Sequence, residues 1–197
     1  MGQGMAIGAV AGCSASMVTL PMQYSTAQYI SMASAGVLGG LVIDFASDCV
    51  AKVGKPIIHR EVVLNAPDIL RHVSTFYATN HTNPVSKMLR QKHEWLILES
   101  HSNKFYVVQK DPATGNLLMD VRMSARTAND LGLAAAGQPT HTGEIRQHRA
   151  DQEFDLPNDL QVAYVIAWLR KEDPRWSFST ENSRHFTTKL RAALNDF

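Results

Sequence analysis

The chain has 197 residues, of which 45% are hydrophobic and 19% charged, and its formal net charge is +1 at pH 7. This is the composition of an ordinary globular protein, and without a basic stripe it argues against a nucleic-acid partner. The only cysteines, Cys13 and Cys49, exclude a disulfide-dense scaffold. No Cys-x-x-Cys, His-x-x-x-His or phosphate-binding glycine loop occurs, so we expect neither a metal nor a cofactor.

Residues 1–84 are expected to form a helical N-terminal segment. Residues 1–22 are nearly uncharged and lack the basic start of a secretory signal. Residues 25–53 are predicted to form a long helix, and residues 26–43 within it carry no charge. That stretch approaches the length of a membrane span, but its glycines and polar residues favour a helix covered by the protein or by a partner. Membrane contact through residues 25–53 is the alternative.

The remainder of this segment leads to a predicted domain boundary. Residues 56–58 and 62–64 are apolar and fit short strands or an extended linker. Asn65, with Pro67 at an early helical position, predicts a helix through about Ala78. Polar turn residues follow, and the boundary is expected there, at residue 84.

Residues 85–197 are expected to form an α+β domain in which helices pack on a small antiparallel sheet. Alternating apolar residues predict a hairpin of two strands and then two further strands, and apolar residues at helical spacing predict three helices. The strands are expected at 93–99, 105–110, 117–122 and 143–149, and the helices at 124–137, 158–171 and 183–197.

The last helix opens with Glu181-Asn182-Ser183-Arg184-His185-Phe186. Ser183 is therefore expected at or near a helix N-terminus, where free backbone N–H groups and the helix dipole favour an anion. A cysteine at this position would have a depressed pKa and would be a ready nucleophile. The ordinary role of a serine here is a helix N-cap.

This hexapeptide resembles the Asn-Cys-x-His-Phe motif of circularly permuted papain-like enzymes, which include the lecithin–retinol acyltransferase family and bacterial NlpC-type peptidases. Ser183 stands in the cysteine position. The strand that begins at His93 and the strand that ends at Gln109 resemble the histidine hairpin of these families. The resemblance implies a permuted papain-like fold, with His93 as the base, Gln109 as the residue that orients it and Ser183 at the nucleophile position. Asp111 is a nearby substitute for Gln109, and His185 is expected to be structural.

The resemblance implies a cysteine-type enzyme that transfers acyl groups from amides or esters, inactive with Ser183 in place of cysteine. An amidase or peptidase is expected first, and a peptidoglycan-directed bacterial effector secreted into the periplasm or a target cell would suit it. An acyltransferase acting on a lipid or a protein, and an inactive interaction module, are the alternatives. The serine is interpreted as an engineered replacement of cysteine, ahead of a natural pseudoenzyme and a true serine enzyme.

A second layout places the nucleophile elsewhere. Ser47-Asp48-Cys49 precedes His93 at about the spacing found in unpermuted NlpC-type peptidases. Cys49, however, falls near the end of the predicted helix, where the dipole would not favour a thiolate. We therefore expect Cys49 to be a small buried hydrophobic residue.

Overall fold

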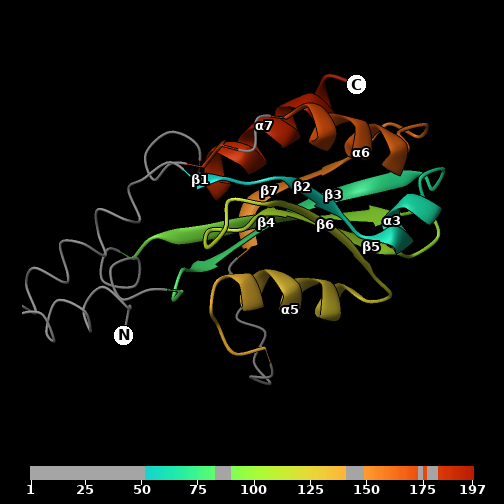
Figure 1. The fold of residues 1–197 in the computed structure, drawn as a ribbon. Coiled ribbons are helices and arrows are strands. Elements are labelled where there is room, and N and C mark those ends of the chain that lie inside the picture. Colours follow the sequence, from blue (N-terminus) through green and yellow to red (C-terminus); the bar gives the residue numbers. More distant parts are fainter. Residues whose placement is uncertain (1–51, 83–89, 141–148, 173–174, 177–181) are drawn as a thin grey trace, which may run out of the picture. The chain divides into compact units, whose positions relative to one another are not determined.

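The computed structural model describes residues 52–82, 90–140, 149–172, 175–176 and 182–197, which lie within one compact unit of the chain. These residues form an α+β structure in which helices cover both faces of a six-stranded sheet (Figure 1). The strands are β1 (Lys52–Val53), β2 (Pro56–Ile58), β3 (Leu70–Thr79), β4 (Lys92–Ser100), β5 (Phe105–Lys110), β6 (Leu117–Arg122), β7 (Arg149–Asp155) and β8 (Arg175–Trp176). The helices are α3 (Arg60–Leu64), α5 (Ala125–Ala135), α6 (Val162–Lys171) and α7 (Ser183–Asn195).

The sheet has the strand order β2-β6-β5-β4-β3-β7. Its strands pair antiparallel with their neighbours except β2, which runs parallel to β6. β1 and β8 form a separate antiparallel pair. The expected α+β class is confirmed, and the sheet is mixed rather than purely antiparallel because of β2.

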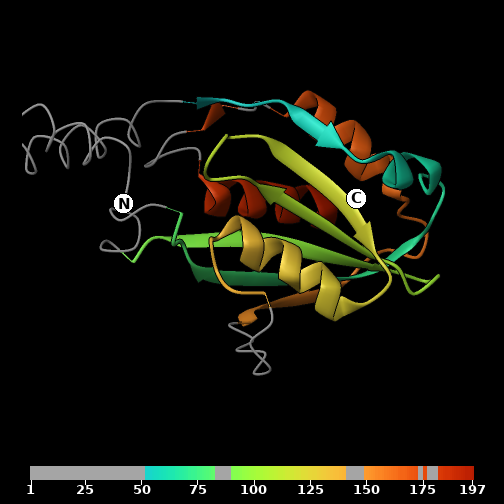
Figure 2. The same cartoon turned by 60° about the horizontal axis from the view of Figure 1, so that its bottom comes forward.

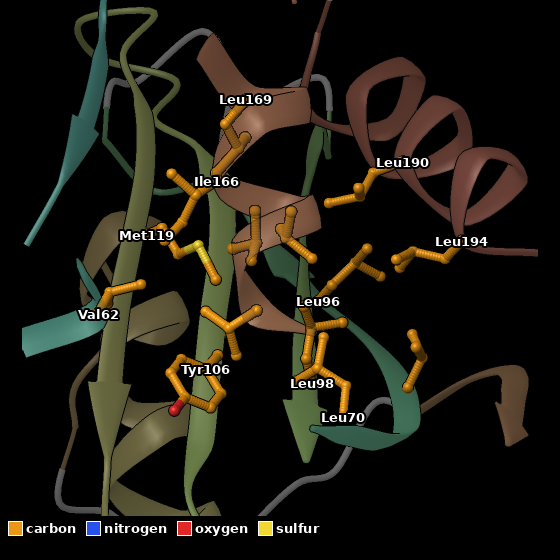
Figure 3. Packing of buried hydrophobic residues seen from close by; sticks show 14 of the residues in the cluster. Val62, Leu70, Leu96, Leu98, Tyr106, Met119, Ile166, Leu169, Leu190 and Leu194 are labelled. Atoms are coloured by element: carbon orange, nitrogen blue, oxygen red, sulfur yellow. The ribbon is translucent and has the colours of Figure 1, made fainter. Parts of the chain in front are cut away.

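The two faces of the sheet carry different cores. Successive residues of a strand point to opposite faces, so β4 supplies Leu96 and Leu98 to one face and Trp95 and Ile97 to the other. Helices α6 and α7 cover the first face and α5 covers the second (Figures 1 and 2). On the first face, side chains of α6 and α7 point toward those of the strands, as Leu190 does toward Leu96 (Figure 3).

The hairpin of the predicted domain is confirmed as β4 and β5, and the third predicted strand is β6. The helix predicted at 124–137 is α5, which Ser124 caps by accepting a hydrogen bond from the Thr127 N–H. Gly137 follows it with a φ of 68°, the left-handed conformation that glycine adopts at a helix end. Helix α6 begins at Val162, later than predicted, because Gln161 pairs with Ile69 as an isolated bridge. Of the strand predicted at 143–149, residues 143–148 lie outside the described residues, and Arg149 is the first residue of β7.

The helix predicted at 65–78 is wrong, because this stretch forms β3. Val73 packs in the core under α6 and α7, whereas Phe76 packs against the core under α5. A strand that is buried on both faces loses the polar alternation that would identify it, and its apolar residues then also match a helical period. Asn65 ends α3 instead of beginning a helix, and residues 60–64 are helical rather than extended.

The sheet crosses the boundary predicted at residue 84, since β3 lies before it and β4 after it, paired from Leu70↔Ser100 to Thr79↔Lys92. Of the long helix predicted at 25–53, residues 25–51 lie outside the described residues, and Lys52–Val53 form β1. Within the described part of the chain, no helix is long and apolar enough to cross a membrane.

Candidate active site

Helix α7 begins where the sequence places it, but Asn182 rather than Ser183 is its cap. The Asn182 Oδ1 accepts hydrogen bonds from the N–H groups of Arg184 at 3.0 Å and His185 at 3.2 Å. The His185 ring also hydrogen bonds to this oxygen through Nδ1, at 3.0 Å, so His185 belongs to the cap. Ser183 is therefore the first residue of the helix, and its side chain is left for another contact.

The Ser183 hydroxyl contacts strand β4. Its Oγ accepts a hydrogen bond from the Glu94 N–H at 3.2 Å, and the residue is only 4% exposed. The last pair between β4 and β5 is Trp95↔Gln109, so Glu94 lies one residue beyond the ladder and has no partner on β5. The side chain of residue 183 thus meets a backbone donor and the N-terminus of α7 together, and both favour a negative charge.

The Glu94 side chain forms a second connection between β4 and α7. Its carboxylate accepts a hydrogen bond from the Thr187 Oγ1 at 2.9 Å, and the Arg184 Nε lies 3.8 Å from it. Thr187 is completely buried and lies one helical turn after Ser183, on the same side of the helix. Two hydrogen bonds to one residue of β4 therefore fix the first turn of α7.

His93 is buried completely and contacts Gln109. The His93 Nε2 lies 3.0 Å from the Gln109 Oε1. A carbonyl oxygen only accepts, so Nε2 carries the proton and Nδ1 is left with its lone pair. The His93 Nδ1 is also buried and has no hydrogen-bond partner in the described part of the chain.

Burial decides the charge of this imidazole. It lowers the pKa of His93 to about 4, and the hydrogen bond to Gln109 and the charge of Asp111 raise it only in part. The ring is therefore neutral at pH 7, in the tautomer in which Nδ1 can accept a proton.

His93 and Ser183 are neighbours without a hydrogen bond between their side chains. The Ser183 Oγ contacts the nitrogen next to His93 in the chain, which puts it within about 6 Å of the His93 Cα. The imidazole, however, is stacked on Trp95, with ring centres 5.6 Å apart, on the face of the sheet that α5 covers. Helix α7 packs on the other face, so the His93 ring and the Ser183 hydroxyl lie on opposite faces of the sheet near the end of the β4–β5 ladder.

Asp111 accepts hydrogen bonds from the Ala113 N–H and the Thr114 hydroxyl within its own turn, so Gln109 is the residue that contacts the imidazole. Cys49 lies outside the described residues. Glu94 was not predicted at the site, although a carboxylate directly before the apolar run at 95–98 was a visible signal.

The described residues hold no group of three or more His, Cys, Asp or Glu side chains that could bind a metal ion. Comparison of the chain with protein-family models, with curated proteins and with solved structures finds no match. The interpretation of the site therefore depends on its own geometry and on the motif resemblance.

Proposed function

We propose that this chain carries the site of a cysteine-type acyl-transfer enzyme of permuted papain-like fold, with Ser183 at the nucleophile position, His93 as the base and Gln109 as its orienting residue. The observation that carries the proposal is the buried His93–Gln109 pair, which leaves the His93 Nδ1 without a partner in the described part of the chain, next in sequence to the Glu94 N–H that contacts Ser183. A general base requires a ring nitrogen with a free lone pair, and the neutral Gln109 carbonyl keeps the proton of His93 on Nε2, so that Nδ1 has that lone pair.

In the proposed reaction, the group at residue 183 attacks the carbonyl carbon of an amide or ester while the His93 Nδ1 takes its proton. The Gln109 carbonyl accepts from Nε2 throughout and stabilises the imidazolium that forms. The imidazolium then returns the proton to the leaving amine or alcohol. Water resolves the acyl-enzyme in a hydrolase, and an amine or alcohol does so in an acyltransferase.

The site suits a thiol better than a hydroxyl. An imidazole with a pKa of about 4 is a weak base for an alcohol, and serine needs more help from its base than cysteine does. A cysteine at 183 would receive the Glu94 N–H and the field of the helix N-terminus, both of which lower a thiol pKa. Its thiolate would in turn raise the pKa of His93 by favouring the imidazolium. With Ser183 in place, we expect no turnover.

The resemblance to NlpC-type peptidases favours an amide substrate, a peptide or the peptide bonds of peptidoglycan, and with it a secreted bacterial effector. The resemblance to the lecithin–retinol acyltransferase family supports an acyl lipid as the alternative substrate. Both use the same chemistry at residue 183 and differ in the acyl donor and acceptor.

The test is to make Ser183→Cys and to assay it on purified peptidoglycan, on peptide amides and on phospholipid. We expect hydrolysis or transfer that falls by about 10²-fold or more in Ser183→Cys/His93→Ala. Ser183→Ala is the matched inactive control. Labelling by a thiol-directed acyl probe must be mapped to residue 183 by mass spectrometry, because Cys13 and Cys49 are also present.

A non-catalytic interaction module is the second candidate, and two observations favour it. The Ser183 hydroxyl is already held by Glu94, and the His93 Nδ1 is not bonded to it. If Ser183→Cys neither turns over any of these substrates nor reacts with the probe faster than Cys13 and Cys49, the acyl-transfer proposal fails and the module remains.

A further inference from the structure

Three aromatic rings follow one another on the α5 face of the sheet and end at the candidate base. Phe76 and Trp95 are a cross-strand pair of β3 and β4, with ring centres 6.2 Å apart and planes at 14°. The Trp95 ring stacks in turn on the His93 ring, at 5.6 Å and 26°. The indole is 1% exposed and lies in the core under α5, so the position of the imidazole depends on that of a buried ring.

Helix α5 approaches this indole at Gly132. A Cβ atom built on Gly132 would lie 2.1 Å from the Trp95 Cε2 and 2.2 Å from its Cδ2, far inside van der Waals contact. The clash is with a large ring that is itself held between Phe76 and His93, so it has no free end that could swing away. Glycine is a poor residue for a helix interior, so the absence of a side chain here serves the packing of the indole.

We infer that Gly132 and Trp95 are positioning residues for His93. Because Gly132 has no side chain, the Trp95 indole can pack directly against the backbone of α5, and the stacked indole sets the plane of the imidazole. Gln109 fixes one edge of the imidazole through Nε2, but a single hydrogen bond leaves the ring free to tilt about it. The stack removes that freedom and directs the bare Nδ1. The importance of this stack for catalysis rests on the proposed function, whereas its effect on the orientation of the His93 ring does not.

The experiment measures His93 directly, by long-range ¹H–¹⁵N NMR of the protein labelled with ¹⁵N-histidine. In the unaltered chain, we expect a neutral ring protonated at Nε2, assigned by the signal that is lost in His93→Gln. Gly132→Ala should displace the indole, change both ring-nitrogen shifts and move the His93 pKa up by about one unit toward its ordinary value. Ala134→Gly, on the exposed side of α5, is the control for helix propensity and should leave His93 unchanged.

Two further variants keep the inference testable if Gly132→Ala does not fold. Trp95→Phe replaces the two-ring indole by a single ring, which reduces the area stacked on His93 without any clash. It should also move the His93 signals. Combined with Gly132→Ala, the smaller ring makes room for the new methyl group, and the double variant should fold like Trp95→Phe alone. Unchanged His93 shifts and titration in folded Gly132→Ala or Trp95→Phe would overturn the inference.

Activity separates this inference from the proposed function. In the Ser183→Cys background, Gly132→Ala should lower kcat by about 10²-fold with KM nearly unchanged, because the base is displaced while substrate contacts remain. If the NMR signals move but the Ser183→Cys protein is inactive on every substrate, the proposed function is wrong and the positioning of His93 stands. If the Ser183→Cys protein is active and the NMR signals do not move, the proposed function stands and the positioning of His93 by Gly132 and Trp95 is wrong.

Discussion

The two ends of the β4–β5 hairpin differ in how their polar side chains are paired. At the turn, the Asp68 carboxylate accepts hydrogen bonds from the Tyr106 hydroxyl at 2.8 Å and the Ser102 hydroxyl at 2.6 Å. The Lys104 ammonium lies 3.7 Å from the same oxygen and donates to the Asn65 side chain. At the other end, His93 is completely buried, and its Nδ1 has no partner in the described part of the chain.

The pKa values follow this difference. Burial raises the pKa of Asp68, but the hydrogen bonds from Ser102, Tyr106 and Ser100 and the charge of Lys104 outweigh it, so the net shift is downward. Burial and the neighbouring Asp68 raise the pKa of Tyr106. For His93, burial dominates and lowers the pKa to about 4.

The comparison indicates which end is structural and which is a site. A satisfied network such as that of Asp68 stabilises one arrangement of the turn and leaves nothing for a ligand. A buried ring nitrogen without a partner costs free energy, and such groups are found where chemistry uses them.

His93 should make the protein sensitive to mild acid. Its pKa of about 4 in the folded chain lies below the ordinary 6.5, so the unfolded chain binds the proton more tightly. The free energy of unfolding should therefore fall as the pH drops from 6.5 to about 4, by about 3 kcal/mol from this residue. Denaturant titrations of the unaltered chain and His93→Gln across this range test it.

The control for this prediction is His101→Gln, which removes an exposed histidine from the turn. It should retain the fall in stability, whereas His93→Gln should lose it. Equal pH dependence in all three proteins would show that the buried imidazole is not the group responsible.

Asp68→Ala should lower the free energy of unfolding at pH 7 by about 1–3 kcal/mol, because it leaves the buried Tyr106 hydroxyl without its acceptor. Tyr106→Phe removes the donor, so the double variant should cost less than the sum of the single ones. The stabilisation from this carboxylate is present above pH 3.8 and is lost below it, as the pH falls through the lowered pKa. Strict additivity of the two substitutions would contradict the network.

Thr187→Val should have the smallest effect on stability, about 1–2 kcal/mol, since it keeps the shape of the side chain but removes the hydrogen bond to Glu94. In the Ser183→Cys background, it should also slow alkylation of the cysteine, because the first turn of α7 is no longer held at β4. Thr187→Ser retains the hydroxyl and is the matched control. Alkylation rates that are the same in the valine and serine variants would show that Glu94 does not position residue 183.

Local patterns were enough for the hairpin and the helices that follow it. Alternation in β4 and β5, the cap and glycine around α5, and the apolar period of α7 each lie within a few residues of one another. The family resemblance implied that Gln109 orients His93, and the two side chains are in contact across adjacent strands. The roles given to His93, Gln109 and Ser183 remain predictions.

Other features could not be found in this way. The apolar residues of β3 match a helical period because the strand is buried on both faces, and this burial comes from helices that are distant in sequence. The Glu94 contacts with Ser183 and Thr187 join residues about ninety positions apart, so no local pattern contains them. No local pattern explains Gly132 either, because the indole that leaves no room for a side chain there belongs to Trp95 on β4.

Residue patterns were sufficient for the β4–β5 hairpin, β6 and the helices α5 and α7, and for the residue types at the candidate site, because backbone propensity and apolar spacing act over one or two turns of chain. The tertiary structure alone decided which face of the sheet each side chain occupies, and so the separation of the His93 ring from the Ser183 hydroxyl. Desolvation, which sets the pKa of His93, is a property of everything packed around the ring and exists only once the chain has folded.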